Sequence, residues 1–349
     1  MSVTIKFELP NAKVHTNAIA MPSSKVVPKT DSLEMFGGIF DDQGLFIPES
    51  GLYRGEGAPI MKGGSLSTNI TNCIDGRVAY GGFLYRTHYG HFLIESLARM
   101  WRLMRHEEFD RIIFHSHPGA VEACPIGDFL LETLGWPKEK ITIINEPTQI
   151  PLLTIPDPAI RLGSTEAFAV HKQVCSAITD RTFGDIYSPF PKQPQPIYFS
   201  RSKFTIRPVF GELELEHELA RQGWEIVYPE QLSVPEQIKI SRKSNIYCGI
   251  IGSAMHNLMF SRQGTRVFYI EREPRHRTTY NTLEAFDKVI GLEPTYIRAN
   301  IEAATFAGPY LINPNIVLDN LKAAGLIGEF VRIDINQATE EYKKHIAAS

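Results

Sequence analysis

His91 and Glu95 are a histidine and a carboxylate four residues apart, a pattern that suits acid–base chemistry. If the segment is helical, the two side chains share one face. The carboxylate is then able to take a proton from a hydroxyl group while the imidazole orients it. A structural role, such as a helix-face ion pair of Glu95 with Arg99, fits the same spacing. The residues alone therefore leave both interpretations open.

Basic side chains follow an apolar run at 197–199 that we interpret as a strand. Arg201 and Lys203 come directly after it, and Arg207 lies in the same loop. An arginine can donate two hydrogen bonds to one phosphate, and a lysine adds a compact positive charge. The loop is therefore a candidate anion site, although Arg201 taken alone fits a surface salt bridge equally well.

A glycine turn follows a second predicted strand, at 246–251. The turn and the start of the helix that it opens comprise Gly252, Ser253, Ala254, His256 and Asn257. Free amides and the dipole at a helix N-terminus favour an anion. Because ligands of parallel sheets bind beyond the carboxyl ends of the strands, we expect Arg201 and this turn to converge on one diphosphate site. An ordinary capped turn is the alternative for the glycine motif by itself.

Other polar clusters are weaker candidates for a functional site. His115 and His117, at a predicted strand end, lack a third ligand and a zinc spacing, so a loop turn is the better interpretation. The chain has no Walker-type or G-x-S-x-G motif. A basic cluster after the strand predicted at 267–270 fits a ligand contact, a solvated loop or transient contact with acidic lipid head groups: Arg272, Arg275, His276 and Arg277.

Apolar patterns indicate an α/β protein. In the first half, a Gly- and Pro-rich stretch of short strands and loops precedes helices predicted at 89–105, 126–134 and 165–183 and strands at 111–114 and 141–144. In the second half, strands at 197–199, 224–228, 246–251, 267–270 and 296–298 alternate with helices, including one with a capping box at Ser233 and Glu236. Such alternation implies a parallel sheet with right-handed crossovers.

Prolines place a domain boundary near the middle of the chain, because proline fits neither a helix interior nor a central strand. The predicted organisation is an N-terminal α/β domain at 1–188, a linker at 189–196, a second α/β domain at 197–312 and a helical tail at 313–349.

Composition excludes several classes of protein. The net charge of the 349 residues is −3, which offers no excess of positive charge for a nucleic-acid backbone. Four cysteines without a C-x-x-C pair indicate free thiols in a reducing compartment: Cys73, Cys124, Cys175 and Cys248. No signal-peptide pattern and no apolar run of the ~20 residues needed to span a bilayer occur. We therefore expect a cytoplasmic protein.

An ordered series of motifs over about residues 85–300 resembles glycosyltransferase family 61. The segment from His91 to Arg99 is similar to the family's H-x-x-x-D/E-x-L-x-R stretch. Further matching positions are Ser200, Arg201, Arg207, Glu212, Glu214, Glu236, Gln237, the Gly252–Phe260 run and Gly264-Thr265. The chain departs from the pattern at Gly211, where the family often has Asn, and at Ile251, where it often has His. His256 matches the G-S-x-x-H-N form of many bacterial relatives.

The resemblance implies a GT-B-like fold, two Rossmann-type domains facing across a cleft, with the C-terminal helices packing back. It also implies an inverting, metal-independent glycosyltransferase, with no cofactor, acting in bacterial surface polysaccharide synthesis of the capsule type. The absence of D-x-D, which metal-dependent transferases commonly use, agrees with a cationic or dipolar clamp. The partners would be a nucleotide-sugar donor on the second domain and a glycan or lipid-linked acceptor on the first, with transient attachment to the inner face of the membrane.

On this interpretation Glu95 is the catalytic base and His91 orients it. The donor diphosphate is bound by Arg201, Lys203, Arg207, Gly252, Ser253, Ala254, His256 and Asn257, with Arg99, Glu236 and Gln237 as further candidates. Two alternatives stay open: another GT-B-type enzyme, such as a sugar-nucleotide epimerase or a pyruvyl transferase, or a non-catalytic protein that binds nucleotide sugars.

Overall fold

The computed structural model describes residues 2–26, 34–57, 59–66, 69–70, 72–86, 88–117, 125–184, 194–273, 277–305 and 308–348. The chain divides into two compact units. Unit 1 comprises Met1–Ile186 and Arg277–Ala285, and unit 2 comprises Tyr187–His276 and Phe286–Ser349. The predicted linker at 189–196 lies mostly outside the described residues, and only 194–196 are described.

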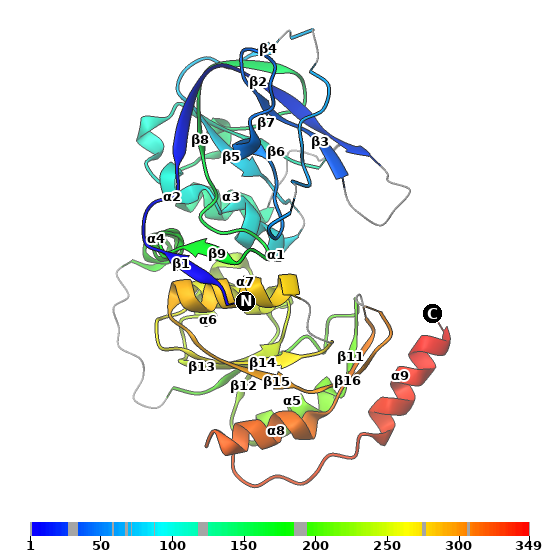
Figure 1. The fold of residues 1–349 in the computed structure, drawn as a ribbon. Coiled ribbons are helices and arrows are strands. Elements are labelled where there is room, and N and C mark those ends of the chain that lie inside the picture. The colour runs from blue at the N-terminus through cyan, green and yellow to red at the C-terminus, as the bar shows by residue number, and fades with distance from the viewer. Residues whose placement is uncertain are drawn as a thin grey trace. The chain divides into compact units, whose positions relative to one another are not determined.

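The main sheet of unit 1 is mixed and has seven strands. Its order is β3 (Glu34–Phe40), β2 (Ala12–Val26), β8 (Thr148–Pro156), β5 (Val78–Phe83), β6 (Arg111–His115) and β7 (Ile141–Ile143), with β4 (Asn72–Cys73) paired to β8. Strands β8, β5, β6 and β7 run parallel, whereas β2 runs antiparallel to both of its neighbours (Figure 1). Strand β2 has 15 residues, whereas the sequence predicts only short strands in this stretch, so that prediction is wrong for β2.

The segment predicted as one helix over 89–105 is broken. It forms α1 (Tyr89–His91), the π-helix η2 (Phe92–Ser96) and α2 (Met100–Leu103). The π turn closes with the Leu97 amide donating to the Phe92 carbonyl at 3.3 Å. The Ser96 hydroxyl donates to the Phe83 carbonyl and accepts the Tyr85 amide, both at 2.9 Å, so the helix is tied to the end of β5. These tertiary bonds explain why the apolar periodicity does not yield a regular α-helix.

The other helices and the two strands predicted at 111–114 and 141–144 are present in unit 1. Helix α3 spans Pro125–Thr133 and α4 spans His171–Phe183. The helix predicted from 165 starts later, because β9 (Glu166–Phe168) pairs in parallel with β1 (Thr4–Lys6). Short 3-10 helices are η1 (Pro48–Ser50), η3 (His106–Glu108) and η4 (Lys138–Lys140).

The main sheet of unit 2 is wholly parallel, as the sequence predicts. Its order is β12 (Glu225–Val227), β10 (Ile197–Phe199), β13 (Ile246–Ile250), β14 (Arg266–Glu271) and β15 (Glu293–Arg298). In chain order this is 2-1-3-4-5, so the connections reverse direction between β10 and β13. Such a switch point is where open α/β sheets bind ligands, beyond the carboxyl ends of the strands.

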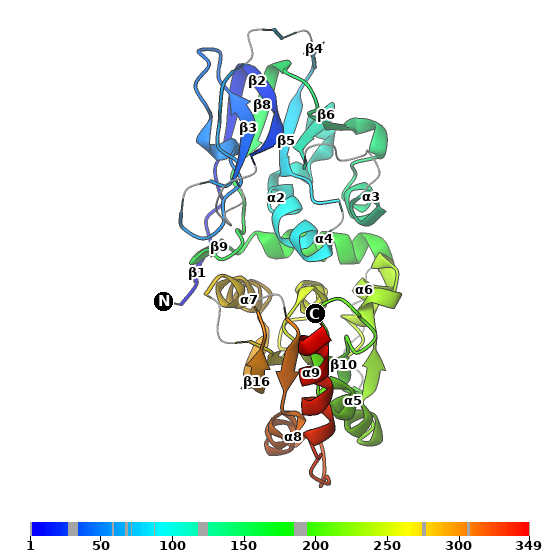
Figure 2. The same ribbon diagram turned by 90° about the vertical axis from the view of Figure 1, so that its right-hand side faces the viewer.

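Helices cover both faces of this sheet (Figures 1 and 2). Helices α5 (Glu212–Arg221) and α8 (Pro314–Ala323) pack on one face, where Leu215, Leu219, Leu318 and Leu321 meet the sheet residues Tyr198 and Ile270. Helix α6 (Val234–Ile240), preceded by η5 (Pro229–Gln231), lies on the other face, and the 3-10 helix η6 (Ser253–Phe260) contacts α6. Helix α7 (Arg277–Ile290) contributes residues to both units.

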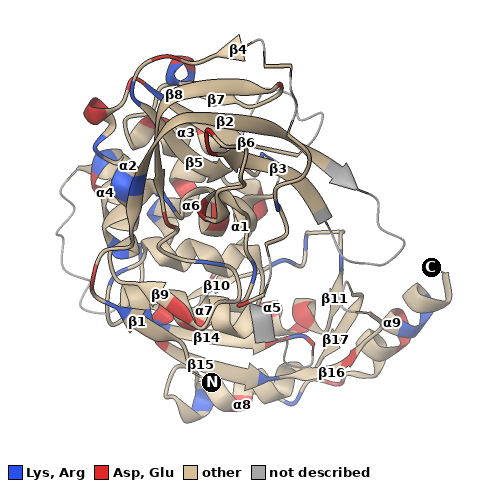
Figure 3. Cartoon of the chain, turned by 45° about the horizontal axis from the view of Figure 1, so that its top comes forward, with Lys and Arg blue, Asp and Glu red and all other residues tan. Residues whose placement is uncertain are grey.

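A second, three-stranded sheet in unit 2 has the order β11 (Val209–Phe210), β17 (Tyr310–Ile312) and β16 (Asn300–Ala303). Helix α9 (Asn336–Ala348) packs Tyr342 against Phe210, with ring centroids 5.8 Å apart. Acidic and basic segments follow one another along α9 (Figure 3). The two C-terminal helices are as predicted, and none of the described helices is long and apolar enough to cross a membrane.

Candidate active site

Four polar side chains of unit 1 form one cluster around the predicted acid–base pair. We call Arg54, Tyr85, His91 and Glu95 the imidazole cluster. His91 ends α1 and Glu95 lies in η2, while Tyr85 follows β5 and Arg54 follows η1. The cluster therefore joins Arg54, which is distant in sequence, to residues 85–95.

Two partners hold the Glu95 carboxylate. Arg54 donates from Nε to Oε1 at 3.1 Å and from Nη2 to Oε2 at 3.2 Å, and His91 Nδ1 lies 2.6 Å from Oε2. The Glu95 side chain is only 3% exposed. Burial acts to raise the pKa of this carboxyl, but the His91 hydrogen bond and the Arg54 charge outweigh burial, so the pKa is lowered. Glu95 is therefore ionised at neutral pH.

The His91 ring is fixed but reachable. It stacks on the ring of Tyr85, with centroids 4.8 Å apart and planes inclined by 21°. Arg54 Nη2 donates to the Tyr85 hydroxyl at 2.7 Å, which holds the ring that His91 packs on. The His91 side chain is 35% exposed, in contrast with the enclosed Glu95.

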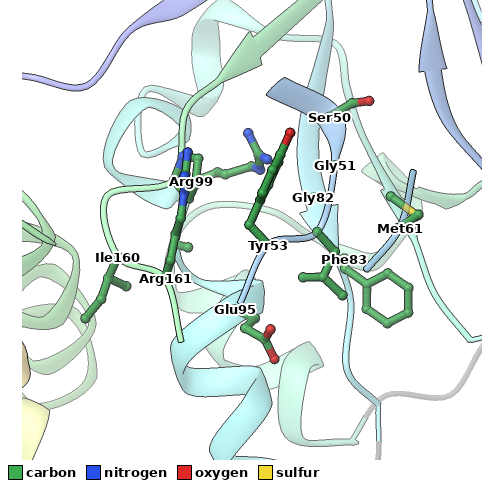
Figure 4. A pocket seen from close by; sticks show the side chains of 13 residues that line it. Ser50, Gly51, Tyr53, Met61, Gly82, Phe83, Glu95, Arg99, Ile160 and Arg161 are labelled. Atoms are coloured by element: carbon green, nitrogen blue, oxygen red, sulfur yellow. The ribbon is translucent and has the colours of Figure 1, made fainter. Parts of the chain in front are cut away.

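Glu95 also lines a small cavity of about 30 Å³ (Figure 4). Its lining includes Arg99, Tyr53 and Arg161, and the Arg161 guanidinium lies 5.0 Å from the centroid of the Tyr53 ring. This volume accommodates a water molecule or two but no sugar. Arg99 forms no ion pair with Glu95, because its guanidinium donates to the Pro156 and Glu49 carbonyls, the latter at 2.6 Å.

In unit 2 the ends of three neighbouring strands bring together Arg201, Gly252 and Arg272, which we call the arginine site. A Cβ built on Gly252 would lie 3.7 Å from Arg201 Nη1 and 3.6 Å from Arg272 Nη1. The sequence-based expectation that Arg201 and the Gly252 turn lie close together therefore agrees with the fold, and Arg272 joins them from the end of β14.

The position of Arg201 is strongly constrained. Its backbone amide donates to Glu212 Oε1 at 2.9 Å, and its Nη2 donates to the carbonyls of Ile206 and Arg207 at 3.1 and 3.0 Å. Burial and the neighbouring Arg272 charge lower the pKa of Arg201. Within the described residues, the buried Nε atoms of Arg201 and Arg272 have no hydrogen-bond partner. An anion would relieve both the like-charge repulsion and the unpaired donors.

Gly252 precedes the first turn of η6 and leaves space at the arginine site. The first backbone bond of this turn runs from the Met255 amide to the Gly252 carbonyl at 3.0 Å. The amides of Ser253 and Ala254 precede that bond, so the helix itself offers them no acceptor. A helix N-terminus thus adds donors to the two guanidinium groups. The predicted helix here is a 3-10 helix, not an α-helix.

Several other predicted site residues have contacts elsewhere. Asn257 Nδ2 donates to Gln237 Oε1 at 2.9 Å, which ties η6 to α6. Glu236 accepts the amide of Ser233 at 2.8 Å in the predicted capping box. Lys203 Nζ lies 3.6 Å from the ring centroid of Tyr228. The exposed Arg207 contributes its carbonyl to Arg201, and the His256 ring lies 5.8 Å from that of Phe286.

The histidines His115 and His117 have structural surroundings. His115 is buried, with Nε2 2.8 Å from the Met21 carbonyl and Nδ1 3.0 Å from the Tyr80 hydroxyl, and burial lowers its pKa to about 4. The His117 ring packs 5.1 Å from that of Phe83. The part of the chain that the structure describes contains no group of three His, Cys, Asp or Glu residues placed to hold a metal ion.

Some predictions from sequence fall outside the described residues, namely those on Arg275, His276 and Cys124. Among the described cysteines, Cys175 and Cys248 are free and buried, whereas Cys73 is free but exposed. The sequence does not identify Arg54 and Tyr85 as site residues, because neither lies in a recognisable motif. Arg272 had a signal, its place directly after a predicted strand, but that signal did not separate a ligand contact from a solvated loop.

Part of the chain matches a known protein family. Residues 89–268 match the family model described as Glycosyltransferase 61. The matched segment contains His91, Glu95, Arg201 and Gly252, while Arg54 precedes it and Arg272 follows it. No curated protein matches the chain significantly.

Proposed function

The chain belongs to the glycosyltransferase 61 family, whose model covers more than half of its residues, and on that premise we propose that it transfers a sugar from a nucleotide-sugar donor to a hydroxyl group of a glycan or lipid-linked acceptor. Family membership implies glycosyltransferase activity. The nucleotide sugar, inversion at the anomeric carbon and independence from metal are our proposals.

The observation that carries the proposal is the arginine site. Two guanidinium groups, Arg201 and Arg272, face one glycine at the switch point of a parallel sheet. A diphosphate bound there would pair with both cations and with the amides that begin η6. Two like-charged groups that are partly desolvated and incompletely hydrogen-bonded are suited to binding an anion, and such an arrangement does not favour stability.

The chemistry follows from that placement. The acceptor oxygen forms a bond to the anomeric carbon while the bond from that carbon to the phosphate oxygen breaks. The electron pair of the broken bond leaves with the nucleoside diphosphate, and the acceptor proton passes to a base. Cations fixed beside the departing phosphate stabilise the charge that develops on it. The chain has no D-x-D pair, so we assign this task to the arginine site rather than to a metal ion.

The finer parts of the proposal rest on the family resemblance. They are the GT-B arrangement of two Rossmann-type domains and a role in bacterial surface polysaccharide synthesis. We also propose a cytoplasmic location, with transient attachment to the membrane surface through the basic cluster that begins at Arg272.

A nucleotide panel tests the proposal. Purified protein is incubated with UDP-, GDP- and CMP-sugars, with and without candidate acceptors, and thermal shifts with the free nucleotides are measured in parallel. We expect one nucleotide to stabilise the protein, following RT ln(1 + [L]/Kd), and nucleotide release to increase when an acceptor is present.

Arg272→Ala should weaken binding of that nucleotide roughly 10- to 100-fold, which corresponds to about 1.5–3 kcal/mol for a charged hydrogen bond. Arg221→Ala, which removes a surface arginine paired with Glu218 on α5, is the control and should bind as the wild type does. Absence of any nucleotide-induced shift, or normal binding by Arg272→Ala, would refute the diphosphate site.

A further inference from the structure

We infer that His91, rather than Glu95, takes the proton from the acceptor hydroxyl, and that Glu95, Arg54 and Tyr85 position it. This inference rests on the proposed sugar transfer and assigns roles within the imidazole cluster. It reverses the roles that the sequence pattern favours for the two residues.

Glu95 is poorly placed to act as a base. Both of its oxygens accept hydrogen bonds, Oε1 from Arg54 and Oε2 from Arg54 and His91. Its side chain is 3% exposed, so an acceptor hydroxyl has little access to either oxygen. A carboxylate stabilised in its charged form also has a low affinity for a proton. Its surroundings suit a fixed negative charge.

The same contacts define the tautomer of His91. An ionised carboxylate can only accept hydrogen bonds, so the nitrogen 2.6 Å from Glu95 Oε2 must carry the hydrogen. That nitrogen is Nδ1, and the neutral ring then has its lone pair on Nε2. Arg54 Nη2 lies 3.4 Å from Nδ1, but two donors cannot bond to each other, and Arg54 directs its hydrogens to Glu95 and Tyr85.

An acceptor hydroxyl can reach His91 more easily than it can reach Glu95. Its side chain is 35% exposed, and one face of its ring is covered by Tyr85. Arg54 links the hydroxyl of Tyr85 to the carboxylate of Glu95, so the two groups that orient the imidazole are joined by one guanidinium. The three positioning residues thus fix the ring in two directions and leave Nε2 as its basic atom.

The proposed step balances. The acceptor O–H bond breaks and its proton forms a bond to His91 Nε2, while the oxygen bonds to the anomeric carbon. The electron pair of the breaking carbon–oxygen bond leaves on the nucleoside diphosphate. The imidazolium formed beside Glu95 is stabilised by that carboxylate, and it returns its proton to solvent before the next turnover.

Chemical rescue tests the assignment. The rate is that of sugar transfer or, if no acceptor is known, of donor hydrolysis with water in its place, using the nucleotide sugar selected by the panel. His91→Gly should lower kcat roughly 10²- to 10⁴-fold. Added imidazole should restore at least a tenth of the lost rate, because the exposed site can admit it beside Tyr85. A merely structural histidine would not show such rescue.

Glu95→Gln and Arg54→Lys should lower kcat without rescue by imidazole, because they disturb the orientation of a ring that is still present. All three variants should keep the nucleotide-induced thermal shift of the wild type, which also shows that they fold. His217→Ala, an exposed histidine on α5, is the control and should keep full activity.

The inference is overturned if His91→Gly keeps more than a tenth of the wild-type rate. It is also overturned if formate rescues Glu95→Gly while imidazole fails to rescue His91→Gly, since Glu95 would then be the base. If the wild type binds nucleotide and transfers sugar, and His91→Gly is also active, only this inference is wrong. If the wild type neither binds nor turns over any nucleotide sugar, the proposed function is wrong as well.

Discussion

At the scale of single residues, two buried glutamates show how surroundings decide protonation. Glu95 has Arg54 and His91 as partners, and its pKa is lowered. Glu212 is fully buried beneath the Arg201 loop, where Oε1 accepts from the Tyr198 hydroxyl at 3.0 Å and from the Arg201 amide, while Oε2 has no partner among the described residues. Burial raises the pKa of Glu212 to about 7. The first glutamate is suited to carry charge, and the second holds a backbone in place.

Glu212 makes stability depend on pH. Its pKa rises from 4.5 in the unfolded chain to about 7 in the native protein, so the native state binds more protons between these values. The free energy of unfolding should therefore fall as pH rises through this window, by about 3 kcal/mol from this group. Glu212→Gln should remove that part of the dependence, so its stability relative to the wild type should rise between pH 5 and pH 8 in urea unfolding.

Glu214→Gln on the same helix is the matched control and should leave the pH dependence as it is. If Glu212→Gln and the wild type lose stability in parallel between the two pH values, burial does not hold the proton on Glu212 as described.

At the scale of elements, the irregular helices position the chemistry. The π turn of η2 encloses Glu95 while His91, at the end of α1, stays partly exposed. A π turn within a helix is uncommon and is often found at functional sites. In α6 and η6, by contrast, residues of the family motifs make structural hydrogen bonds. Glu236 accepts from Ser233 and caps α6, and Asn257 donates to Gln237 and links η6 to α6.

The cap of α6 gives a prediction that separates structure from binding. Ser233→Ala removes the capping box and should lower the free energy of unfolding by about 1 kcal/mol. Neither Ser233→Ala nor Glu236→Ala should change nucleotide affinity, measured by thermal shift and calorimetry. A large loss of affinity in Glu236→Ala alone would support the prediction from sequence that Glu236 belongs to the donor site.

At the scale of the whole molecule, neither unit is one continuous stretch of chain. Residues 277–285 belong to unit 1, although the segments before and after them belong to unit 2. Within unit 1, Gly163 donates its amide to Thr282 Oγ1 at 2.8 Å and accepts from Asn281 Nδ2 at 3.0 Å. A single cut near the predicted linker would therefore remove part of unit 1.

Thr282→Val tests how much residues 277–285 contribute to the stability of unit 1. Valine has nearly the same shape but cannot accept a hydrogen bond, so the buried Gly163 amide would lose its partner. We expect the free energy of unfolding to fall by about 1–3 kcal/mol, with unchanged nucleotide affinity. Thr279→Val, at a half-buried position of the same helix, should cost much less. Equal effects of the two substitutions would mean that the bond to Gly163 contributes nothing specific.

The sequence by itself determined the alternation of strands and helices in the second half, the cap at Ser233, and the family. Each of these depends on residues that are close in sequence or on an ordered series of motifs. The same local logic placed Arg201 and Gly252 at strand ends, and parallel pairing then required neighbouring strands to present those ends at one edge.

Only the tertiary structure decided which side chains meet. Arg54 comes from a loop with no motif, yet it pairs with Glu95 and replaces the local partner Arg99, whose guanidinium is taken by distant carbonyls. Likewise, the apolar periodicity of 89–105 could not reveal that bonds from Ser96 to the end of β5 interrupt the helix. The physical reason is that hydrogen bonds and burial act through space, and residue spacing along the chain reports only the neighbours within an element.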